Sequence, residues 1–358
     1  MSNYTVFLKK TTRIAIFIFL IASIYPVGVY AADYQPRQAR VIGKVSSGSG
    51  SYFSVAVGTK LYVSNYIANT VSVIDTVTDT TMSTIPVGIH PYGITAVGSY
   101  VYVNNSGANT VSVINTATNT VVSTVTVGYM PLWSVVVGNN LYVSDTSGVS
   151  VINTTTNTLL TTVYYTSSGS MTVVGNKIYL PESDPFSPGL SILDTVTHSI
   201  SGFISLSSVP MSSTLVGSTL YVQLYGSNQV AVVNTTTSTV TMYISVGMNP
   251  TSSVLVGTKL YVNNYTSGTV SVIDTITNTV ISPPLVLGGN HNFFSTKVNN
   301  KIYTNNNTSN SVSIIDSNTN LVSQVLPVAS GPSYSTSVGS KLYVSNYNAG
   351  SVYVVQTY

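Results

Sequence analysis

Short apolar runs alternate with polar turns along the chain, and one such pattern returns about every 40 residues. Its clearest mark is an apolar residue followed by a tyrosine. The pair occurs at Leu61-Tyr62, Val101-Tyr102, Leu141-Tyr142, Ile178-Tyr179, Leu220-Tyr221, Leu260-Tyr261, Ile302-Tyr303 and Leu342-Tyr343. Further β-prone runs surround each pair, as at residues 71–76, 94–98 and 121–128. One period therefore holds four short strands.

A period near 40 residues with four strands is typical of a propeller blade, because one small twisted sheet cannot bury both of its faces alone. Eight copies predict an all-β fold, a β-propeller with eight four-stranded blades in a single domain over residues 32–358. The last copy ends at Tyr358 after three strands, and a spare strand lies at residues 41–45. We expect this strand to complete the last blade and remove two exposed sheet edges. Seven blades, with one irregular copy, is the alternative.

The wording of the repeat carries a family resemblance. LYVSNY at residues 61–66, NTVSVIDT at 69–76 and TNTVVSTVTVG at 118–128 resemble the YVTN-type β-propeller repeat family, over essentially the whole chain after its leader. The resemblance implies an exported or cell-surface protein. Related propellers include binding modules, a periplasmic single-stranded-DNA binder and enzymes, so the resemblance implies no particular activity and assigns no functional residue.

Composition narrows the classes further. Only 6% of the 358 residues are charged, against about 25% in an ordinary soluble domain. With 44% apolar residues, this excludes charge-rich helical bundles and disordered chains. The chain has no cysteine, which excludes disulfides, thiolate nucleophiles and cysteine-based metal sites.

The first 31 residues have the features of a secretory signal peptide. Lys9, Lys10 and Arg13 precede an apolar run over residues 14–24, and small residues end it at Ala31. An uncleaved membrane anchor is the alternative. From residue 32 onward nine acids balance nine bases, and no apolar run reaches the length of a membrane span. We expect an exported protein, periplasmic, cell-surface or secreted, and a monomer.

Residues that recur in every period are better explained by packing than by a ligand. The eight tyrosines of the apolar-Tyr pairs are expected in the core. Asp75 and its counterparts Asn115, Asn153, Asp194, Asn234, Asp274 and Asp316 each begin a turn whose backbone they accept hydrogen bonds from. Lysines recur two residues before the tyrosines and are spread around the ring, which does not favour phosphate binding.

Function is expected where the copies differ. Aligned innermost strands give aromatic residues in blades seven, eight and one to three, and small residues with Met211 in blades four to six. This crescent is a candidate platform for stacking sugars or bases, although about half of its rings would alternatively be inter-blade core. We take its candidate ligand-binding residues, with two histidines of the top loops, to be Phe53, Tyr92, Trp133, Phe293, Phe294, Tyr334, His90 and His291.

A second deviation is the long Pro-rich loop at residues 181–189. It carries Glu182, the one glutamate of the chain, and Asp184. Two carboxylates in such a loop are a candidate Ca²⁺ site or an acceptor for sugar hydroxyls. A solvated acidic loop is the alternative, and no other cofactor is expected.

These observations favour a non-catalytic binding module that recognises a neutral glycan or another envelope protein through its top face. One alternative is a propeller-scaffold enzyme of the lactonase or lyase type, which needs polar groups converging on the channel. The other is a weak single-stranded nucleic-acid binder, which is unlikely because the lysines do not cluster.

Overall fold

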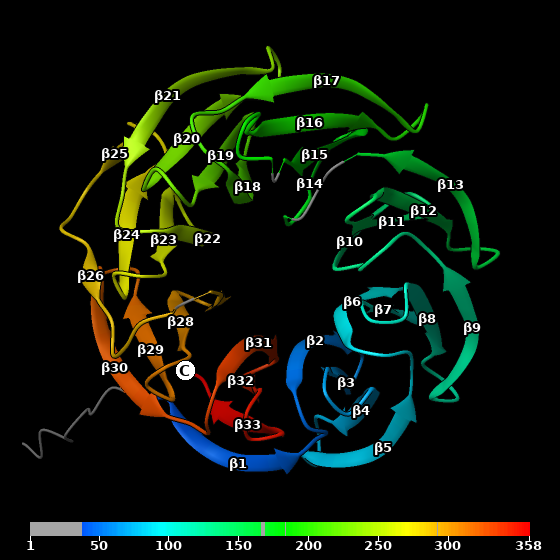
Figure 1. Cartoon of the computed structure of the whole chain (residues 1–358). Helices are drawn as coiled ribbons and strands as arrows, with labels where there is room; N and C mark the ends of the chain where they lie inside the picture. Colours follow the sequence, from blue (N-terminus) through cyan, green and yellow to red (C-terminus); the bar gives the residue numbers. More distant parts are fainter. Residues whose placement is uncertain (1–37, 166–168, 183, 292) are drawn as a thin grey trace, which may run out of the picture. The chain divides into compact units, whose positions relative to one another are not determined.

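The computed structural model describes residues 38–165, 169–182, 184–291 and 293–358. The expected signal peptide at residues 1–31 lies outside them. Residues 39–358 form one compact unit, in which antiparallel sheets follow one another around a ring (Figure 1). The described residues contain no helix, and hence none that is long and apolar enough to cross a membrane.

Each blade consists of consecutive strands that are hydrogen-bonded in chain order, from the channel outward. The strands of the first four blades are β2 Ser51–Val57, β3 Lys60–Asn65, β4 Thr70–Asp75 and β5 Thr80–Pro86; β6 Pro91–Val97, β7 Tyr100–Asn105, β8 Thr110–Asn115 and β9 Thr120–Thr126; β10 Trp133–Val137, β11 Asn140–Asp145, β12 Gly148–Asn153 and β13 Thr158–Tyr164; β14 Thr172–Val174, β15 Lys177–Pro181, β16 Gly189–Asp194 and β17 Ser199–Ser205.

The second half of the ring repeats this order. Its strands are β18 Pro210–Val216, β19 Thr219–Leu224, β20 Gln229–Asn234 and β21 Thr239–Ser245; β22 Pro250–Val256, β23 Lys259–Asn264, β24 Thr269–Asp274, β25 Thr279–Val280 and β26 Leu285–Val286; β27 Ser295–Val298, β28 Lys301–Asn306, β29 Ser311–Asp316 and β30 Leu321–Pro327; β31 Pro332–Val338, β32 Lys341–Asn346, β33 Ser351–Gln356 and β1 Arg40–Ser46. In blade six the outer strand is split into β25 and β26, which both pair with β24.

The ring closes as the sequence predicts. β1, at the N-terminal end, pairs antiparallel with β33 and becomes the outer strand of the eighth blade. The innermost strands β2 and β31 of blades one and eight also contact each other. The eight-blade prediction is confirmed, and the seven-blade alternative is wrong.

The core lies between blades rather than within them. Eight buried apolar clusters occur, one at each boundary between neighbouring blades, here called a seam. The eight repeated tyrosines are buried in these seams, which confirms their structural role. At the first seam the Tyr62 hydroxyl donates to Asn119 Oδ1 of the next blade at 2.8 Å. Each seam thus joins apolar packing to a hydrogen bond that fixes one blade against the next.

The turns on the bottom face explain the remaining repeats. Asp75 Oδ1 accepts the backbone N–H of Val77 at 2.7 Å, and Asn119 adopts a left-handed conformation with φ of 54°. Lys60 donates its Nζ to the carbonyl of Thr116 in the next blade at 2.6 Å. Lys259 and Lys341 make the same kind of contact across their own seams. These lysines hold blades together.

Candidate functional site at the channel mouth

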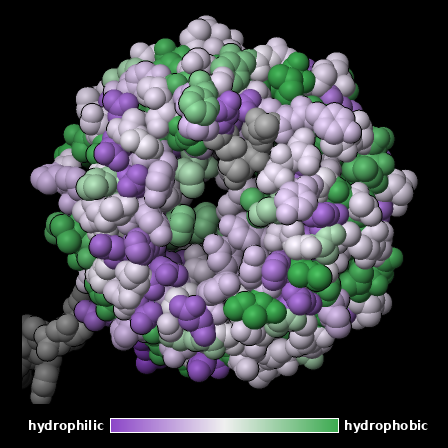
Figure 2. Space-filling view, in the orientation of Figure 1, coloured by the Kyte–Doolittle hydropathy of each residue, from purple (hydrophilic) through white to green (hydrophobic). Residues whose placement is uncertain are grey.

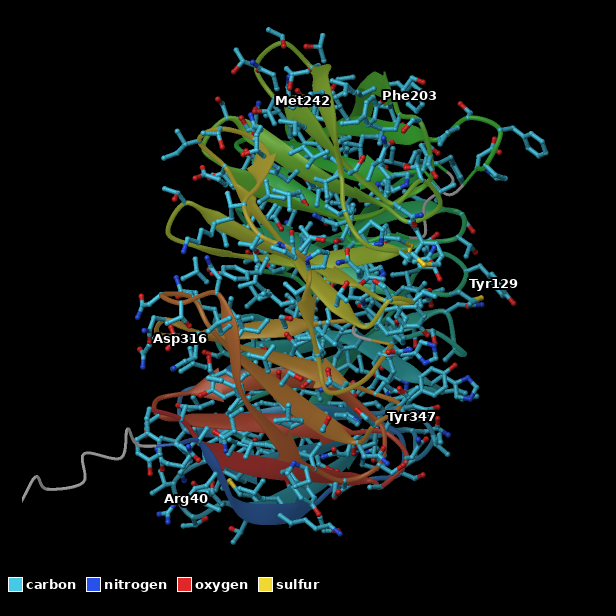
Figure 3. All side chains as sticks on the ribbon, turned by 90° about the vertical axis from the view of Figure 1, so that its left-hand side faces the viewer. Arg40, Tyr129, Phe203, Met242, Asp316 and Tyr347 are labelled. Carbon is cyan, nitrogen blue, oxygen red and sulfur yellow. The ribbon has the colours of Figure 1, made fainter. Side chains whose placement is uncertain are left out.

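The two faces of the propeller differ in what they present. Figure 3 shows Tyr129 and Tyr347 on one face and Asp316, in a turn between outer strands, on the other. The first face, called the top face, holds the loops that lead into the innermost strands. Figure 2 shows it with a hollow at its centre. This hollow is the mouth of the channel, where the sequence predicts the site.

Aromatic rings from opposite sides of the ring meet at the mouth. Phe53 of blade one is only 5% exposed, and its ring centroid lies 5.2 Å from that of Trp133 and 5.5 Å from that of Phe294. Tyr334 packs on Phe53 and Phe294 at 4.9 and 5.4 Å. Phe53 and Tyr334 therefore belong to a packed cluster that supports the other rings.

A second layer of rings lies beside this cluster. Tyr92 has its ring centroid 5.6 Å from that of Trp133 and 5.0 Å from that of Tyr52, and Tyr52 lies 5.6 Å from Tyr347. Tyr347 in turn lies 6.3 Å from Tyr66. A continuous row of aromatic rings thus runs from Trp133 outward across blades three, two, one and eight.

Both candidate histidines stack on tyrosines. His90 is exposed and stacks on Tyr66, with ring centroids 4.5 Å apart. His291 stacks on Tyr265 at the same distance, and Tyr265 also contacts Phe293 at 4.5 Å. The histidines therefore support rings of the second layer from outside, and each holds a positive φ in its loop.

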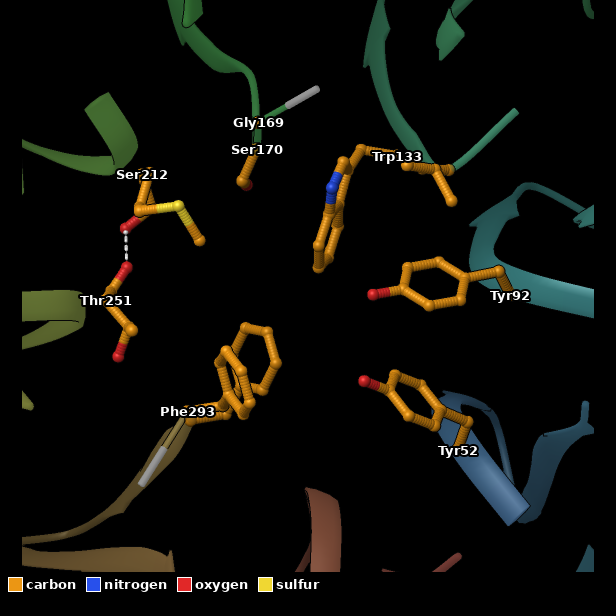
Figure 4. Close-up of a pocket in the computed structure, with 11 residues that line it drawn as sticks. Tyr52, Tyr92, Trp133, Gly169, Ser170, Ser212, Thr251 and Phe293 are labelled. Atoms are coloured by element: carbon orange, nitrogen blue, oxygen red, sulfur yellow. Dashed lines mark hydrogen bonds between the residues drawn. The ribbon is translucent and has the colours of Figure 1, made fainter. Parts of the chain in front are cut away.

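A cavity of about 160 Å³ lies between the aromatic crescent and the small residues of blades four to six (Figure 4). Tyr52, Tyr92 and Trp133 form one side, and the two hydroxyl groups of the tyrosines point into it. The remaining lining residues are Leu132, Gly169, Ser170, Met211, Ser212, Thr251, Phe293 and Phe294. The predicted difference between the two halves of the ring produces this space.

Two further cavities adjoin the first. One, of about 320 Å³, is lined by Tyr52, Tyr66, Tyr92, Ser106, Met130, Leu132 and Tyr347. The other, of about 110 Å³, is lined by Tyr52, His291, Phe293, Asn307, Pro332, Ser333 and Tyr347. None of the residues that line the three cavities is Asp, Glu, Lys or Arg. The site is therefore aromatic and uncharged apart from one histidine.

Burial keeps the phenols of this site protonated. It raises the pKa of Tyr92 far above the usual value for tyrosine, and it raises the pKa of Tyr52 and Tyr334 as well. At neutral pH these hydroxyl groups are hydrogen-bond donors and acceptors without charge.

The small residues of blades four to six are partly committed to the scaffold. Ser212 Oγ donates to Gln223 Oε1 and to the carbonyl of Thr251, both at 2.7 Å. Ser252 Oγ donates to the carbonyl of Phe293 in the same way. These bonds cross from one blade to the next, so this side of the cavity is a fixed wall.

Sequence reasoning missed part of this site. Tyr66, Tyr265 and Tyr347 were not predicted, although each follows the repeated tyrosine of its blade by four residues. The signal was a second tyrosine column that is filled in only some blades. Tyr52 was seen in the aligned columns, but its position between all three cavities follows only from the structure.

The acidic candidates lie in local hydrogen-bond networks. Glu182 Oε1 accepts from Ser191 Oγ at 2.7 Å, where Asn65 in blade one instead donates to Ser72 Oγ. Asp184 is exposed, and its Oδ1 accepts the N–H of Phe186 at 2.9 Å. Calcium binding by this pair stays a prediction, and Ser183 between them lies outside the described residues.

Asp145 occupies the same position in blade three. It is 1% exposed and accepts from the backbone N–H of Ser147 at 2.9 Å and from Ser150 Oγ at 3.0 Å. Burial raises the pKa of its carboxyl group, although these hydrogen bonds oppose the shift. Within the described part of the chain, no three His, Asp or Glu side chains are grouped closely enough to hold a metal ion.

Comparison with known proteins supports the fold alone. No family model matches the chain, and no curated protein matches it. Among solved structures, Sqt1 of Saccharomyces cerevisiae is similar with a TM-score of 0.75 and 13% identity, over 89% of this chain and 99% of its own. BamB of Moraxella catarrhalis has a TM-score of 0.72 and 13% identity, over 89% and 100%.

The dihydro-heme d1 dehydrogenase NirN is also similar, with a TM-score of 0.69 and 12% identity, over 89% of this chain and 78% of its own. At such identities the likeness shows the architecture only. Because a dehydrogenase stands among the similar structures, the architecture is compatible with an interaction module but does not select one.

Proposed function

We propose that this protein is an exported, non-catalytic β-propeller that binds a neutral glycan at the mouth of its channel. The observation that carries the proposal is the group of three adjoining cavities, lined by aromatic and uncharged polar side chains. Export, at the cell surface, in the periplasm or as a secreted protein, and membership of the YVTN-type repeat family belong to the same proposal. They rest on the leader and the repeat wording.

The chemistry of the cavities fits a sugar. A sugar ring presents C–H groups on a face, which pack on an aromatic ring, and hydroxyl groups at its edge, which need hydrogen-bond partners. Trp133, Tyr92 and Tyr52 offer both kinds of contact at one place, because the phenol groups stay protonated. A charged ligand would lack a counter-charge here and would lose its hydration without compensation.

The lysine positions weigh against binding of a nucleic-acid backbone. The Nζ atoms of Lys60, Lys259 and Lys341 are hydrogen-bonded to turns of neighbouring blades, away from the aromatic rings of the mouth. Nucleic-acid binders place such charges along the path of the phosphates.

A protein partner is a second candidate, for which one observation speaks. Apolar side chains of the top loops are exposed around the mouth, among them Ile89, which is 51% exposed, and Tyr129, which is 59% exposed. Exposed apolar patches of this kind are typical of interaction surfaces. An envelope protein could therefore bind the top face beside or in place of a glycan.

A glycan-array screen tests the proposal. The natural chain is compared with Tyr52→Ala, which alters all three cavities, and with Tyr164→Ala, which removes an 83% exposed ring from the outer strand β13. We expect a neutral glycan to bind the natural chain and the Tyr164 variant, and Tyr52→Ala to lose it while keeping the melting temperature within a few degrees. Absence of any glycan hit overturns the proposal, and a hit that Tyr52→Ala retains overturns this location.

A further inference from the structure

The three cavities share side chains in a way that suggests one extended site. Tyr52 lines all of them, and Tyr347 lines the two outer ones. Trp133 lines only the inner cavity. A ligand in the inner cavity therefore touches Tyr52 from one side, while a ligand in either outer cavity touches the same ring and Tyr347.

The sizes of the cavities favour joint occupation. Ligand pockets usually measure about 300–1,000 Å³. The inner cavity, at about 160 Å³, and the smaller outer one, at about 110 Å³, lie below that range alone. Together with the 320 Å³ cavity they fall well within it. A ligand that occupied the inner cavity alone would leave the aromatic surface of Tyr66 and Tyr347 uncovered.

The rings also form a path that a chain of sugars can follow. From Trp133 the path leads to Tyr92, then to Tyr52 and then to Tyr347, with ring centroids 5.6, 5.0 and 5.6 Å apart. His90 stacks on Tyr66 and His291 stacks on Tyr265, so the outer tyrosines are held from behind at both ends. Rings fixed in this way cost little conformational entropy when a ligand covers them.

We infer that the site binds a linear neutral oligosaccharide, with one sugar in the inner cavity beside Trp133 and following sugars in the outer cavities beside Tyr347. This inference rests on the proposed function and adds the substrate class: an oligomer rather than a single sugar. Affinity then depends on chain length, because each added residue gains its own aromatic contact.

Titration calorimetry with defined sugars tests the inference. The probes are linear oligomers of one to four residues of glucose, mannose, galactose or N-acetylglucosamine. For the series that binds, we expect the trimer to bind at least about tenfold more tightly than the monomer, a difference of about 1.4 kcal/mol.

Two variants separate the parts of the site. Tyr347→Ala is expected to weaken the trimer about tenfold and to change the monomer less than about twofold, because this ring lines only the outer cavities. Trp133→Ala is expected to weaken both oligomers, and Tyr164→Ala to weaken neither. A melting temperature for each variant shows that a loss of binding is not a loss of folding.

The outcomes distinguish this inference from the proposed function. Equal affinity for monomer and trimer, or equal weakening of both by Tyr347→Ala, overturns the extended site while glycan binding stands. Failure of every probe to bind overturns glycan binding, and the extended site with it.

Discussion

The buried tyrosines of the seams are expected to make the propeller unusually sensitive to alkali. Burial raises the pKa of Tyr62, Tyr102, Tyr261 and Tyr303 to about 12, against 10.0 for a free side chain. The pKa is also raised in the other four repeated tyrosines, Tyr142, Tyr179, Tyr221 and Tyr343. The perturbation is a rise in pH from about 9 to about 11.

The sign of the effect follows from proton linkage. Between pH 10 and pH 12 the folded state keeps a proton on each of these phenols, and the unfolded state releases it. The free energy of unfolding is therefore unaffected below pH 10 and falls as the pH rises toward 12. At pH 11 the loss is on the order of 1 kcal/mol for each tyrosine with a pKa of about 12, after allowance for solvent near the hydroxyl end. Eight such groups approach the whole stability of an ordinary domain, about 5–15 kcal/mol.

Urea unfolding at a series of pH values measures this loss, and two variants give it an internal control. Tyr62→Phe removes one titrating group from a seam, so its free energy of unfolding is expected to fall about 1 kcal/mol less between pH 9 and pH 11 than that of the natural chain. At neutral pH the same variant is less stable by about 1 kcal/mol, because the hydrogen bond to Asn119 is lost. Tyr164→Phe changes an exposed ring and leaves the pH dependence unchanged. Parallel pH curves for all three proteins would refute the reasoning.

Further predictions concern single charged groups. Lys341→Met removes the ion pair that joins blade eight to Asp79 of blade one at 2.7 Å, and urea unfolding is expected to show a loss of about 1 kcal/mol, partly recovered when Asp79→Asn is added; an unchanged midpoint would contradict it. Asp145→Asn is expected to stabilise the protein at pH 7, because the raised pKa makes the buried carboxylate unfavourable above its usual titration range, and the gain should shrink as the pH falls toward 4; a loss of stability at pH 7 speaks against this account. If Glu182 and Asp184 hold calcium, millimolar calcium raises the melting temperature of the natural chain but not of Glu182→Ala, and the absence of a shift in the natural chain excludes the site.

The fold was predictable because each seam makes the same demands. Every blade must supply a tyrosine to the seam, a turn residue that accepts its hydroxyl or lies beside it, and apolar residues on alternating faces of the middle strands. Repeated requirements leave repeated residues, so the spacing alone gives the blade count. The closing strand was predictable for the same reason, since β33 would otherwise leave an open edge that β1 can pair with.

The split outer strand of blade six illustrates a feature that the pattern did not predict. β25 and β26 are separated by a segment with two exposed prolines, Pro283 and Pro284, which cannot donate to a strand ladder. The copies were aligned on their apolar residues, and an outer strand has few of these to lose. Irregularity there leaves the seams unchanged and so leaves the period unchanged.

The site was predictable only in part. The alignment placed aromatic residues on one half of the mouth, and Trp133, Tyr92, Phe293, Phe294 and His291 do line the cavities. It could not show that Phe53 and Tyr334 pack beneath them, because residues of neighbouring columns alternate between channel and core in ways that depend on bulges. Such register shifts occur between Ser51 and Ser54 in blade one and between Pro332 and Tyr334 in blade eight.

The location of the site follows from where the ring leaves its residues free to vary. A residue in a seam has a partner in the next blade, so a change in one copy must be matched in another. The first residues of the innermost strands face the channel, where only residues from across the ring can restrain them. In this chain, large rings fill one side of that space, and the side of Ser170 and Ser212 leaves it open. An eight-bladed scaffold built from nearly equal copies thereby acquires one cavity system rather than eight weak ones, and recognition can change through channel-facing residues while every seam is kept.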